Sequence, residues 1–295
     1  IEKVLLAYDG SNESEEALAY AVFLSEKFGS EITGVYVSMI DTMPMYLNYP
    51  YAESSIFFSL MEQTEKNRKA KFSSIESLLA KQGISFKGRV LRGEPGREIV
   101  DLAHADKTDL IVIGKRGHGL IDRLLIGSTA LKVLRESDIP VLAVKKREKK
   151  DTVQIKKLLV PVDIAEKTDS ALNYAIRLGE ELNATISVVF VVKLESYDFE
   201  IPYKLLENLI PFASSELAKQ VEEIKLNLGV KSEIKTEVIQ GLNTPLSIVN
   251  YASSNDIDLI ILNTHGRKGI KRLILGSVAE KVIQESHCSV LALKP

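Results

Sequence analysis

A glycine-rich segment in the first half of the chain combines the residue types that a phosphate site needs. Gly114 and Gly117 follow an apolar run, while Gly127 directly precedes an amphipathic segment that begins at Ser128. Glycine has no Cβ, so a ligand can approach its backbone closely. The start of a helix adds unpaired N–H groups and about half a positive charge. Glycines placed between a strand and a helix start therefore indicate an anion site.

Polar side chains around these glycines support the same prediction. Ser128 and Thr129 supply hydroxyl donors, and Lys115 and Arg116 supply positive charge. One charge-assisted hydrogen bond contributes about 1.5–3 kcal/mol, so a few of them support micromolar binding. A single glycine would more simply indicate a turn. The whole pattern favours a phosphate, although it is neither a Walker A loop nor a dinucleotide fingerprint.

The second half of the chain repeats the first. Lys3–Asp9 resembles Lys157–Asp163, and Asp109–Ile111 matches Asp258–Ile260. The later matches pair Arg123, Gly127 and Ser128 with Arg272, Gly276 and Ser277. A repeat of this length indicates two copies of one domain. We expect the domains at 1–148 and 154–295, joined by a charged linker.

Short apolar runs alternate with amphipathic segments in the first copy, which predicts buried parallel strands and helices in turn. The predicted strands are Lys3–Tyr8, Glu31–Val37, Ser85–Leu91, Leu110–Gly114 and Val141–Lys145. The predicted helices are Ser14–Phe28, Ile56–Gln82, Pro95–Ala105 and Ser128–Ser137. The apolar residues of the long second helix are Leu60, Phe72, Ile75, Leu78 and Leu79.

The second copy keeps this order of elements. Its predicted strands are Lys157–Val162, Thr185–Val191, Lys231–Ile239, Asp258–Leu262 and Val290–Leu293. The alternation predicts an α/β fold, with parallel strands and with helices on both faces of each sheet. Ligands of such sheets bind beyond the carboxyl ends of the strands. The glycine segment follows the fourth strand, so it belongs to this edge.

Together with Asp9 at the end of the first strand, the glycine pattern resembles the nucleotide motif of the universal stress protein family. The second copy matches it at Asp163, Gly266, Gly276 and Ser277, so the resemblance covers nearly the whole chain. It implies two tandem doubly wound five-stranded parallel sheets of strand order 3-2-1-4-5, similar to the adenine-nucleotide alpha-hydrolase fold. It also implies that ATP is the ligand, with or without Mg²⁺, while ADP and AMP stay open.

The resemblance assigns a place to single residues of the first half. Ala7, Tyr8 and Asp9 would line the nucleoside, with Asp9 near the ribose, and the backbone of Val37 would meet the adenine edge. Ile113 and Gly114 would flank the ribose and the α-phosphate. The phosphates would be held by Gly117, Gly127, Ser128 and Thr129, beside the charges of Lys115 and Arg116.

The second half departs from the motif at one position. Asn263 stands where the first glycine is expected, and its side chain could crowd a phosphate. Asparagine tolerates left-handed φ better than most residues, so the turn itself can survive. We therefore expect tighter ATP binding by the first half. The weaker site comprises Pro161, Val162, Asp163, Val191, Asn263, Gly266, Gly276 and Ser277.

Other reactive residue types have plainer explanations. His118 and His265 lie in the glycine loops and are more typical of solvated loop residues. Cys288 is expected to pack as a small apolar residue, and with His287 it gives too few ligands for a structural zinc site. The segment 39–51, rich in methionine and tyrosine, fits a lid or partner surface as well as ordinary packing under the next helix.

The composition argues against several classes of protein. The chain has 295 residues, of which 45% are hydrophobic and 26% charged, with a formal net charge of −2. This charge does not suit a broad nucleic-acid or acidic-membrane surface. No apolar run reaches the roughly 20 residues of a membrane span. One cysteine allows no internal disulfide, so we expect a reducing, cytoplasmic environment.

Three functions are compatible with these observations. The first is a nucleotide-responsive stress or signalling module that acts on an unknown protein partner. The second is a slow ATPase or phosphotransferase, although Asp9 and Asp163 are the only carboxylates in position and both are assigned to the nucleoside. The third is an interaction protein that binds no nucleotide. The turn Asp9–Asn12 lacks the Ser-Gly-Gly-x-Asp-Ser sequence of related hydrolases, so no catalytic residue is predicted.

The last strand of each copy is apolar and stands at an edge, so it needs cover. Dimers of the resembling family meet through this strand. We therefore expect an internal pseudo-dimer through Val141–Val144 and Val290–Leu293, and further association of two chains into a homodimer.

Overall fold

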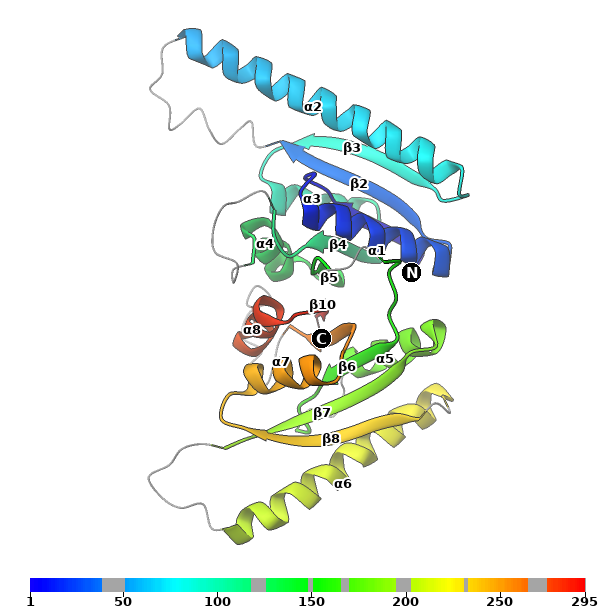
Figure 1. Ribbon diagram of the computed structural model, residues 1–295, viewed down its shortest axis with the longest axis vertical. Helices are drawn as coiled ribbons and strands as arrows, with labels where there is room; N and C mark the ends of the chain where they lie inside the picture. Colours follow the sequence, from blue (N-terminus) through cyan, green and yellow to red (C-terminus); the bar gives the residue numbers. More distant parts are fainter. Residues whose placement is uncertain are drawn as a thin grey trace. The chain divides into compact units, whose positions relative to one another are not determined.

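The chain folds into two compact α/β units, Ile1–Val153 and Gln154–Pro295, as the computed structural model shows (Figure 1). The structure describes residues 1–38, 51–117, 126–147, 151–165, 170–194, 203–230, 233–264 and 275–294, with the backbone alone for 51–58 and 203–207.

In the first unit, strands and helices alternate from the first strand to the last. They are β1 (Lys3–Ala7), α1 (Asn12–Phe28), β2 (Glu31–Ser38), α2 (Tyr51–Ala80), β3 (Phe86–Arg92), α3 (Pro95–Ala105), β4 (Leu110–Gly114), α4 (Ser128–Glu136) and β5 (Val141–Val144). The strands pair in parallel in the order β3-β2-β1-β4-β5. This order confirms the predicted doubly wound arrangement.

The second unit repeats the arrangement. Its elements are β6 (Lys157–Pro161), α5 (Ser170–Leu182), β7 (Thr185–Lys193), α6 (Tyr203–Leu228), β8 (Ile234–Gly241), α7 (Thr244–Ser254), β9 (Leu259–Asn263), α8 (Ser277–Glu285) and β10 (Ser289–Leu293). The parallel order is β8-β7-β6-β9-β10. The order 3-2-1-4-5 thus occurs in both halves.

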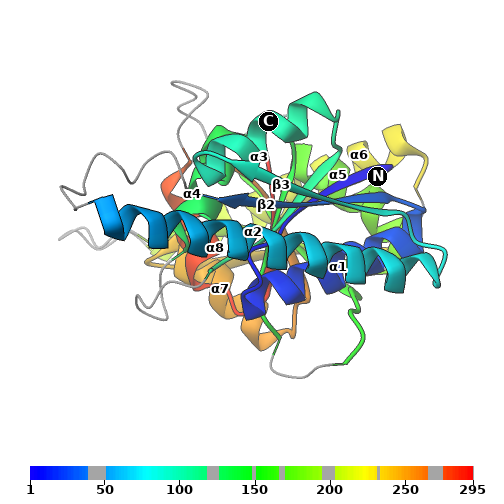
Figure 2. The same ribbon diagram turned by 90° about the horizontal axis from the view of Figure 1, so that it is seen from above.

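Helices cover both faces of the first sheet. Figure 2 shows α1 and α2 on one side of the strands and α3 and α4 on the other. The central strands are buried almost throughout: β4 is buried at every position, and β1 at all but its first. Their sequences, Leu-Ile-Val-Ile-Gly and Lys-Val-Leu-Leu-Ala, have the continuous apolar character of a strand that is covered on both sides.

Successive turns of helix α2 pack against successive residues on one face of β2. Gly34 pairs with Gly88 of β3, and Phe72 packs on this glycine pair: a Cβ on Gly88 would lie 2.6 Å from Cγ of Phe72. One turn earlier along α2, the Arg68 guanidinium lies 5.2 Å from the centre of the Tyr36 ring. Near the strand's end, Ser38 shares a hydrogen bond with Glu65. Alternate residues of a strand point to one face, so three successive inward positions of β2 meet successive turns of the helix.

Several predicted boundaries differ from the structure by a few residues. Helix α1 begins at Asn12, two residues before the predicted start, because Oγ of Ser11 accepts a hydrogen bond from the Ser14 amide at 3.1 Å. Tyr51 belongs to α2 and not to the preceding loop. Leu60 and Leu78, predicted on the apolar face of that helix, are 62% and 58% exposed.

The buried face of α2 contains only part of the predicted set. Phe72, Ile75 and Leu79 are buried against the sheet, as expected. In the second unit, the described part of β8 begins at Ile234, and the predicted start at Lys231 lies outside the described residues. Among the described residues, no helix is both long enough and apolar enough to cross a membrane.

Candidate functional site

The pairing of β1 with β4 brings Asp9 to the glycine loop. Ala7 is in register with Ile113, so the residues that follow both strands meet at one edge of the sheet. A Cβ on Gly117 would lie 2.6 Å from Oδ2 of Asp9. The other carboxylate oxygen, Oδ1, accepts a hydrogen bond from the Ser11 amide at 2.9 Å. The turn after β1 and the loop after β4 are thus in direct contact through Asp9.

Gly127 lies beside Gly117, as the sequence predicts for a shared site. A Cβ on Gly127 would lie 3.7 Å from the Gly117 amide nitrogen and 3.5 Å from the Lys115 carbonyl oxygen. The Gly127 amide donates to that carbonyl at 2.8 Å. Gly127 has φ −64°, which any residue can adopt. The local fold therefore does not require glycine at position 127.

The first turn of α4 differs from the starts of α1, α3 and α7 in one respect. Side chains cap α1, α3 and α7, through Ser11, Glu94 and Asn243 respectively. At α4 the capping position is Gly127, and no side chain in the described part of the chain caps its amides. Helix-start amides need an acceptor, and a bound anion can supply it. Ser128, exposed, and Thr129, half-buried, begin this turn.

Positive charge gathers beside the glycines, partly from a residue that the sequence assigned only to the end of the last strand. Val144 is in register with Gly114, so Lys145 directly follows at the same edge. Burial and the nearby Arg116 guanidinium lower the pKa of Lys145, while Glu13 opposes them. The Lys115 side chain, by contrast, is buried. The positive charge that reaches this edge therefore comes from Arg116 and Lys145, which are both half-buried.

Gly114 has a packing role. A Cβ there would lie 2.8 Å from Cβ of Glu13 and 3.0 Å from the Glu13 carbonyl carbon. Because backbone cannot move as easily as a flexible side chain, a larger residue would push α1 away from β4. The bare backbone of Gly114 thus brings the start of α1 close to the end of β4.

The residues predicted around the nucleoside are mostly covered by the protein. Ala7 and Ile113 are 7% and 5% exposed, while Val37 is half-buried. The Tyr8 hydroxyl donates to Glu15, and its ring lies 5.6 Å from that of Phe72. Burial and this hydrogen bond raise the pKa of Tyr8. The Tyr8 side chain therefore lies under α1 and α2, and its backbone stands at the strand end.

The structure adds Arg68, which the sequence did not single out. Gly10 has φ +79°, and a Cβ on it would lie 2.7 Å from Cζ of Arg68. The guanidinium thus rests on the turn that carries Asp9. No local sequence pattern indicates this contact, because Arg68 lies near the turn only as a result of how α2 is aligned on β2.

The second half reproduces the backbone of this edge. The Val162 amide donates to Val189, as Tyr8 does to Val35, and both distances are 2.9 Å. The Gly276 amide donates to the Thr264 carbonyl at 2.7 Å. Helix α8 also starts without a side-chain cap from the described residues. Local backbone geometry has therefore survived in both copies.

Side chains distinguish the second half from the first. Oδ1 of Asp163 accepts from the Ala165 amide at 3.0 Å, equivalent to the turn at Asp9. Oδ1 of Asn263 accepts from the Ser170 hydroxyl at 2.6 Å, so its side chain points toward the start of α5. Pro161 and Val162 are half-buried and Val191 is buried, while Ser277 is exposed. Gly266 lies outside the described residues.

The other residues considered in the sequence analysis do not form a site among the described residues. His118, His265 and residues 39–50 lie outside the described residues, so the lid prediction stays open there. Within the described parts of the chain, no three His, Cys, Asp or Glu side chains cluster as metal ligands would. Cys288 is buried, as expected for a packed residue.

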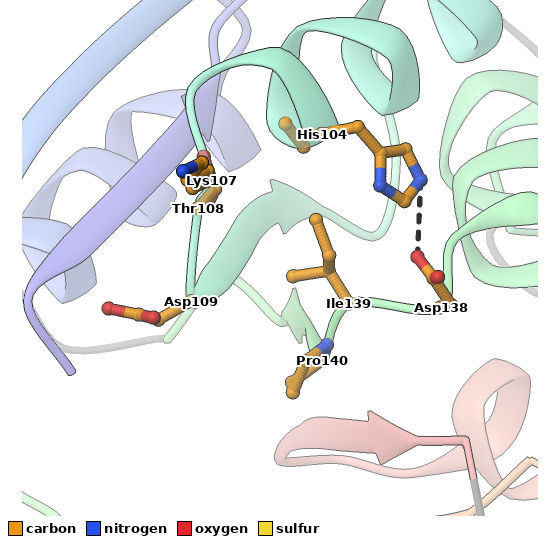
Figure 3. A pocket seen from close by; sticks show the side chains of 8 residues that line it. His104, Lys107, Thr108, Asp109, Asp138, Ile139 and Pro140 are labelled. Carbon is orange, nitrogen blue, oxygen red and sulfur yellow. Dashed lines mark ion pairs between the residues drawn. The ribbon is translucent and has the colours of Figure 1, made fainter.

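A pocket of about 540 Å³ lies at the opposite edge of the first sheet (Figure 3). It is lined by the end of α3 and by the residues that lead into β4 and β5, and Nε2 of His104 lies 3.1 Å from Oδ1 of Asp138. Asp109 in its wall accepts hydrogen bonds from the amides of Glu2 and Lys3, so this carboxylate holds the start of β1. The glycine loop and Asp9 are not part of this pocket.

Each half is thus a doubly wound parallel α/β domain, and in the first half the carboxyl edge of the sheet holds Asp9 against the glycine loop. The family model described as "Universal stress protein family" matches residues 1–145 and 154–294. The chain belongs to the universal stress protein family, with two tandem domains.

Relatives and solved structures agree with this membership. A universal stress protein of Methanocaldococcus jannaschii is 33% identical over 142 residues, which are 47% of this chain and 82% of the relative. One from Thermus aquaticus is 34% identical over 143 residues, 48% of this chain and 97% of the relative. The crystal structure of a universal stress protein from Archaeoglobus fulgidus covers 99% of this chain and 96% of its own, with a TM-score of 0.72 at 20% identity. That likeness concerns the fold.

Proposed function

We propose that the first half binds an adenine nucleotide, with ATP as the main ligand, and that the protein acts as a nucleotide-responsive stress module. One observation carries this proposal. The start of α4 has no cap among the described side chains, and it stands beside the bare backbones of Gly117 and Gly127, with Asp9 in contact. A helix start combined with glycines and a carboxylate can bind a phosphate and a ribose at once.

The ligand groups divide among the residues as follows. The phosphates are bound by the amides and hydroxyls of Ser128 and Thr129, next to Gly117 and Gly127. Arg116 and Lys145 add positive charge at this end. Asp9 accepts hydrogen bonds from the ribose hydroxyls, while the backbones of Val37, Ile113 and Gly114 border the nucleoside. Mg²⁺ would accompany the phosphates of ATP.

The second half forms the weaker site of the proposal. Its backbone hydrogen bonds match those of the first half, so Asp163, Gly276 and Ser277 take the places in the fold that Asp9, Gly127 and Ser128 take in the first half. Asn263 adds bulk where the first half has Gly114. In the structure the Ser170 hydroxyl donates a hydrogen bond to this side chain at 2.6 Å.

The experiment that tests the proposal starts from the purified full chain. Acid extraction followed by chromatography identifies any nucleotide that copurifies, and calorimetric titration with ATP, ADP and AMP, with and without Mg²⁺, ranks them. We expect ATP to bind in the micromolar range. Protein that carries no nucleotide and takes up none of the three would overturn the proposal and favour a nucleotide-free interaction protein.

A slow ATPase is the second candidate, because Asp9 lies where a phosphate would be close. Its Oδ1 is bonded to the Ser11 amide, and its Oδ2 faces Gly117. This arrangement suits an acceptor for hydroxyls better than a base for water. Retention of γ-labelled phosphate on the protein over hours favours the binding module, whereas rapid magnesium-dependent release favours the enzyme. The homodimer and the protein partner stay predictions.

A further inference from the structure

Arg68 occupies an unusual place in the first half. It reaches from α2 to the turn after β1, and Cζ of its guanidinium would lie 2.7 Å from a Cβ on Gly10. The guanidinium also contacts Tyr36, whose ring centre lies 5.2 Å from Cζ of Arg68. A guanidinium at this distance from an aromatic ring has a favourable cation–π interaction. The side chain is therefore fixed between a strand residue and the turn.

The turn under Arg68 has a conformation that needs support. Gly10 is in the left-handed region, with φ +79°. This places the Ser11 amide 2.9 Å from Oδ1 of Asp9 and so sets the direction of the carboxylate, whose Oδ2 faces Gly117. A glycine turn is free to open because no side chain restricts it. Arg68 fills the space that a side chain at residue 10 would have filled.

The second half braces the same turn with different chemistry. There Ile164 follows Asp163, as Gly10 follows Asp9, and its carbonyl accepts a hydrogen bond from Nε2 of Gln220 at 2.7 Å. Gln220 lies on α6, the counterpart of α2, and α6 contains no arginine. Both halves thus use the same helix to hold the residue after the aspartate. This repetition points to a role in positioning and not to an accidental contact.

We propose that Arg68 is a positioning residue that fixes the Asp9 turn for recognition of a ribose, and that Gln220 does the same at Asp163. The inference rests on the nucleotide site proposed above. Because Asp9 acts on the ribose hydroxyls, the loss of Arg68 affects ligands that carry these hydroxyls. A ligand without them gains nothing from a correctly directed carboxylate.

The test compares ATP with 2′,3′-dideoxy-ATP on the full-length wild type and on Arg68→Ala, by calorimetry. We expect Arg68→Ala to weaken ATP binding about tenfold, the effect of one charge-assisted hydrogen bond, while dideoxy-ATP affinity stays within about twofold. Lys66→Ala is the matched control, since Lys66 is an exposed cation on the same helix, and it should leave both affinities at the wild-type values. Equal weakening of both ligands, or an unchanged ATP affinity, would overturn the inference.

A second measurement does not depend on nucleotide. Hydrogen exchange followed by mass spectrometry or NMR reports the Ser11 amide, which donates to Asp9. We expect Arg68→Ala to speed this exchange about tenfold and Gln220→Ala to do so only at the Ala165 amide. If the wild type binds no ATP but the exchange responds, the nucleotide proposal fails and the brace stands. If the exchange at Ser11 does not change, the brace itself is wrong.

Discussion

The carboxylate of Asp9 lies directly against the backbone of Gly117. Only 2.6 Å would separate Oδ2 from a Cβ at that glycine, although the two residues are far apart in the sequence. Their contact follows from the parallel pairing of β1 with β4, in which Ala7 is opposite Ile113. A side chain at this position would therefore have to displace the Asp9 carboxylate, before any ligand is considered.

Replacing Gly117 or Gly127 by alanine separates the packing of the protein from the space that a phosphate needs. Gly117→Ala forces Asp9 to move, and we expect ATP affinity to fall at least tenfold, together with a lower melting temperature. Gly127→Ala meets neighbours only at ordinary contact distances, from 3.5 Å, and has an ordinary φ. It should therefore keep its melting temperature but still lose affinity, because the added methyl stands where phosphate approaches.

Calorimetry and thermal unfolding of both variants check this pair. A Gly127→Ala protein that binds ATP as well as the wild type would show that no phosphate approaches this glycine. If Gly117→Ala were as stable as the wild type, the contact with Asp9 would have to be looser than described.

The two halves should differ in affinity. Gly276 is equivalent to Gly127 and also begins a helix without a cap from the described side chains. In the full chain, Gly127→Ala should remove the tighter of two binding phases, whereas Gly276→Ala should leave it unchanged. Calorimetric titration resolves the phases. Loss of the tight phase in Gly276→Ala alone would reverse the assignment.

Nucleotide affinity should fall as pH rises through the alkaline range. Burial and Arg116 lower the pKa of Lys145 in the free protein, and a bound phosphate would raise it again by favouring the charged form. Binding then takes up a proton once Lys145 has begun to lose it. Nucleotide affinity is highest at pH values below the pKa of Lys145 in the free protein, and it declines above that pKa. The decline therefore starts at a lower pH than the ordinary lysine pKa of 10.5 would give.

Lys145→Arg provides the check on this pH dependence. Arginine stays charged throughout the range, so the decline should disappear while binding is retained. Lys146→Arg, at the exposed next position, is the control and should keep the wild-type profile. The same decline in Lys145→Arg would mean that another group titrates.

The Glu65–Arg92 pair should stabilise the first unit above pH 4.5 and less below it. Arg92 donates to both carboxylate oxygens, at 2.9 and 3.1 Å, and these bonds lower the pKa of Glu65 from 4.5, while burial opposes them. A depressed folded-state pKa gives stability that is present above the unfolded value and lost as pH falls through the folded one.

Urea unfolding of Glu65→Gln across pH tests this sign. At neutral pH we expect a loss of about 1 kcal/mol, modest because Arg92 is 57% exposed. The difference from the wild type should shrink below pH 4.5. Glu62→Gln, exposed on the same helix, should show no such trend. A constant difference at all pH values would contradict the role of the ionised carboxylate.

The interface between α2 and the sheet should tolerate little extra side-chain volume. A Cβ on Gly88 would lie 2.6 Å from Cγ of Phe72 and 2.7 Å from one of its ring carbons. We expect Gly88→Ala to lower the free energy of unfolding by about 1–3 kcal/mol, the usual cost of overpacking. The losses should be less than additive in Gly88→Ala/Phe72→Ala, because this change removes the Phe72 Cγ and ring carbon that the added Cβ would meet. An additive effect of the two changes would show that they do not compete for the same space.

The sequence allowed the fold to be predicted almost completely. The repeat, the apolar strands and the alternation of elements depend on local patterns, and the pairing order of both halves agrees with the prediction. Errors occurred where local patterns compete with packing. Leu78 fits an apolar spacing, yet Leu79 takes the buried place, because a helix face is narrower than the apolar sequence suggested.

The residues of the site could be predicted only where the residue type and its position in the sequence indicate a role by themselves. Glycines before a helix suggest an anion, and Gly117 does lie beside Gly127. Lys145 and Arg68 have no such signal, since lysines and arginines are common on any surface. Their places follow from strand register and from the alignment of α2 on β2, which no local pattern reveals.

The near-identity of backbone hydrogen bonds in the two halves, against their different side chains, has an evolutionary consequence. When two separate copies of one polypeptide assemble, each substitution is present twice and both sites change together. In a duplicated gene product, Gln220 can replace an arginine brace and Asn263 can replace a glycine without altering the sister site. One half is then free to drift toward a new task while the other keeps the ancestral one.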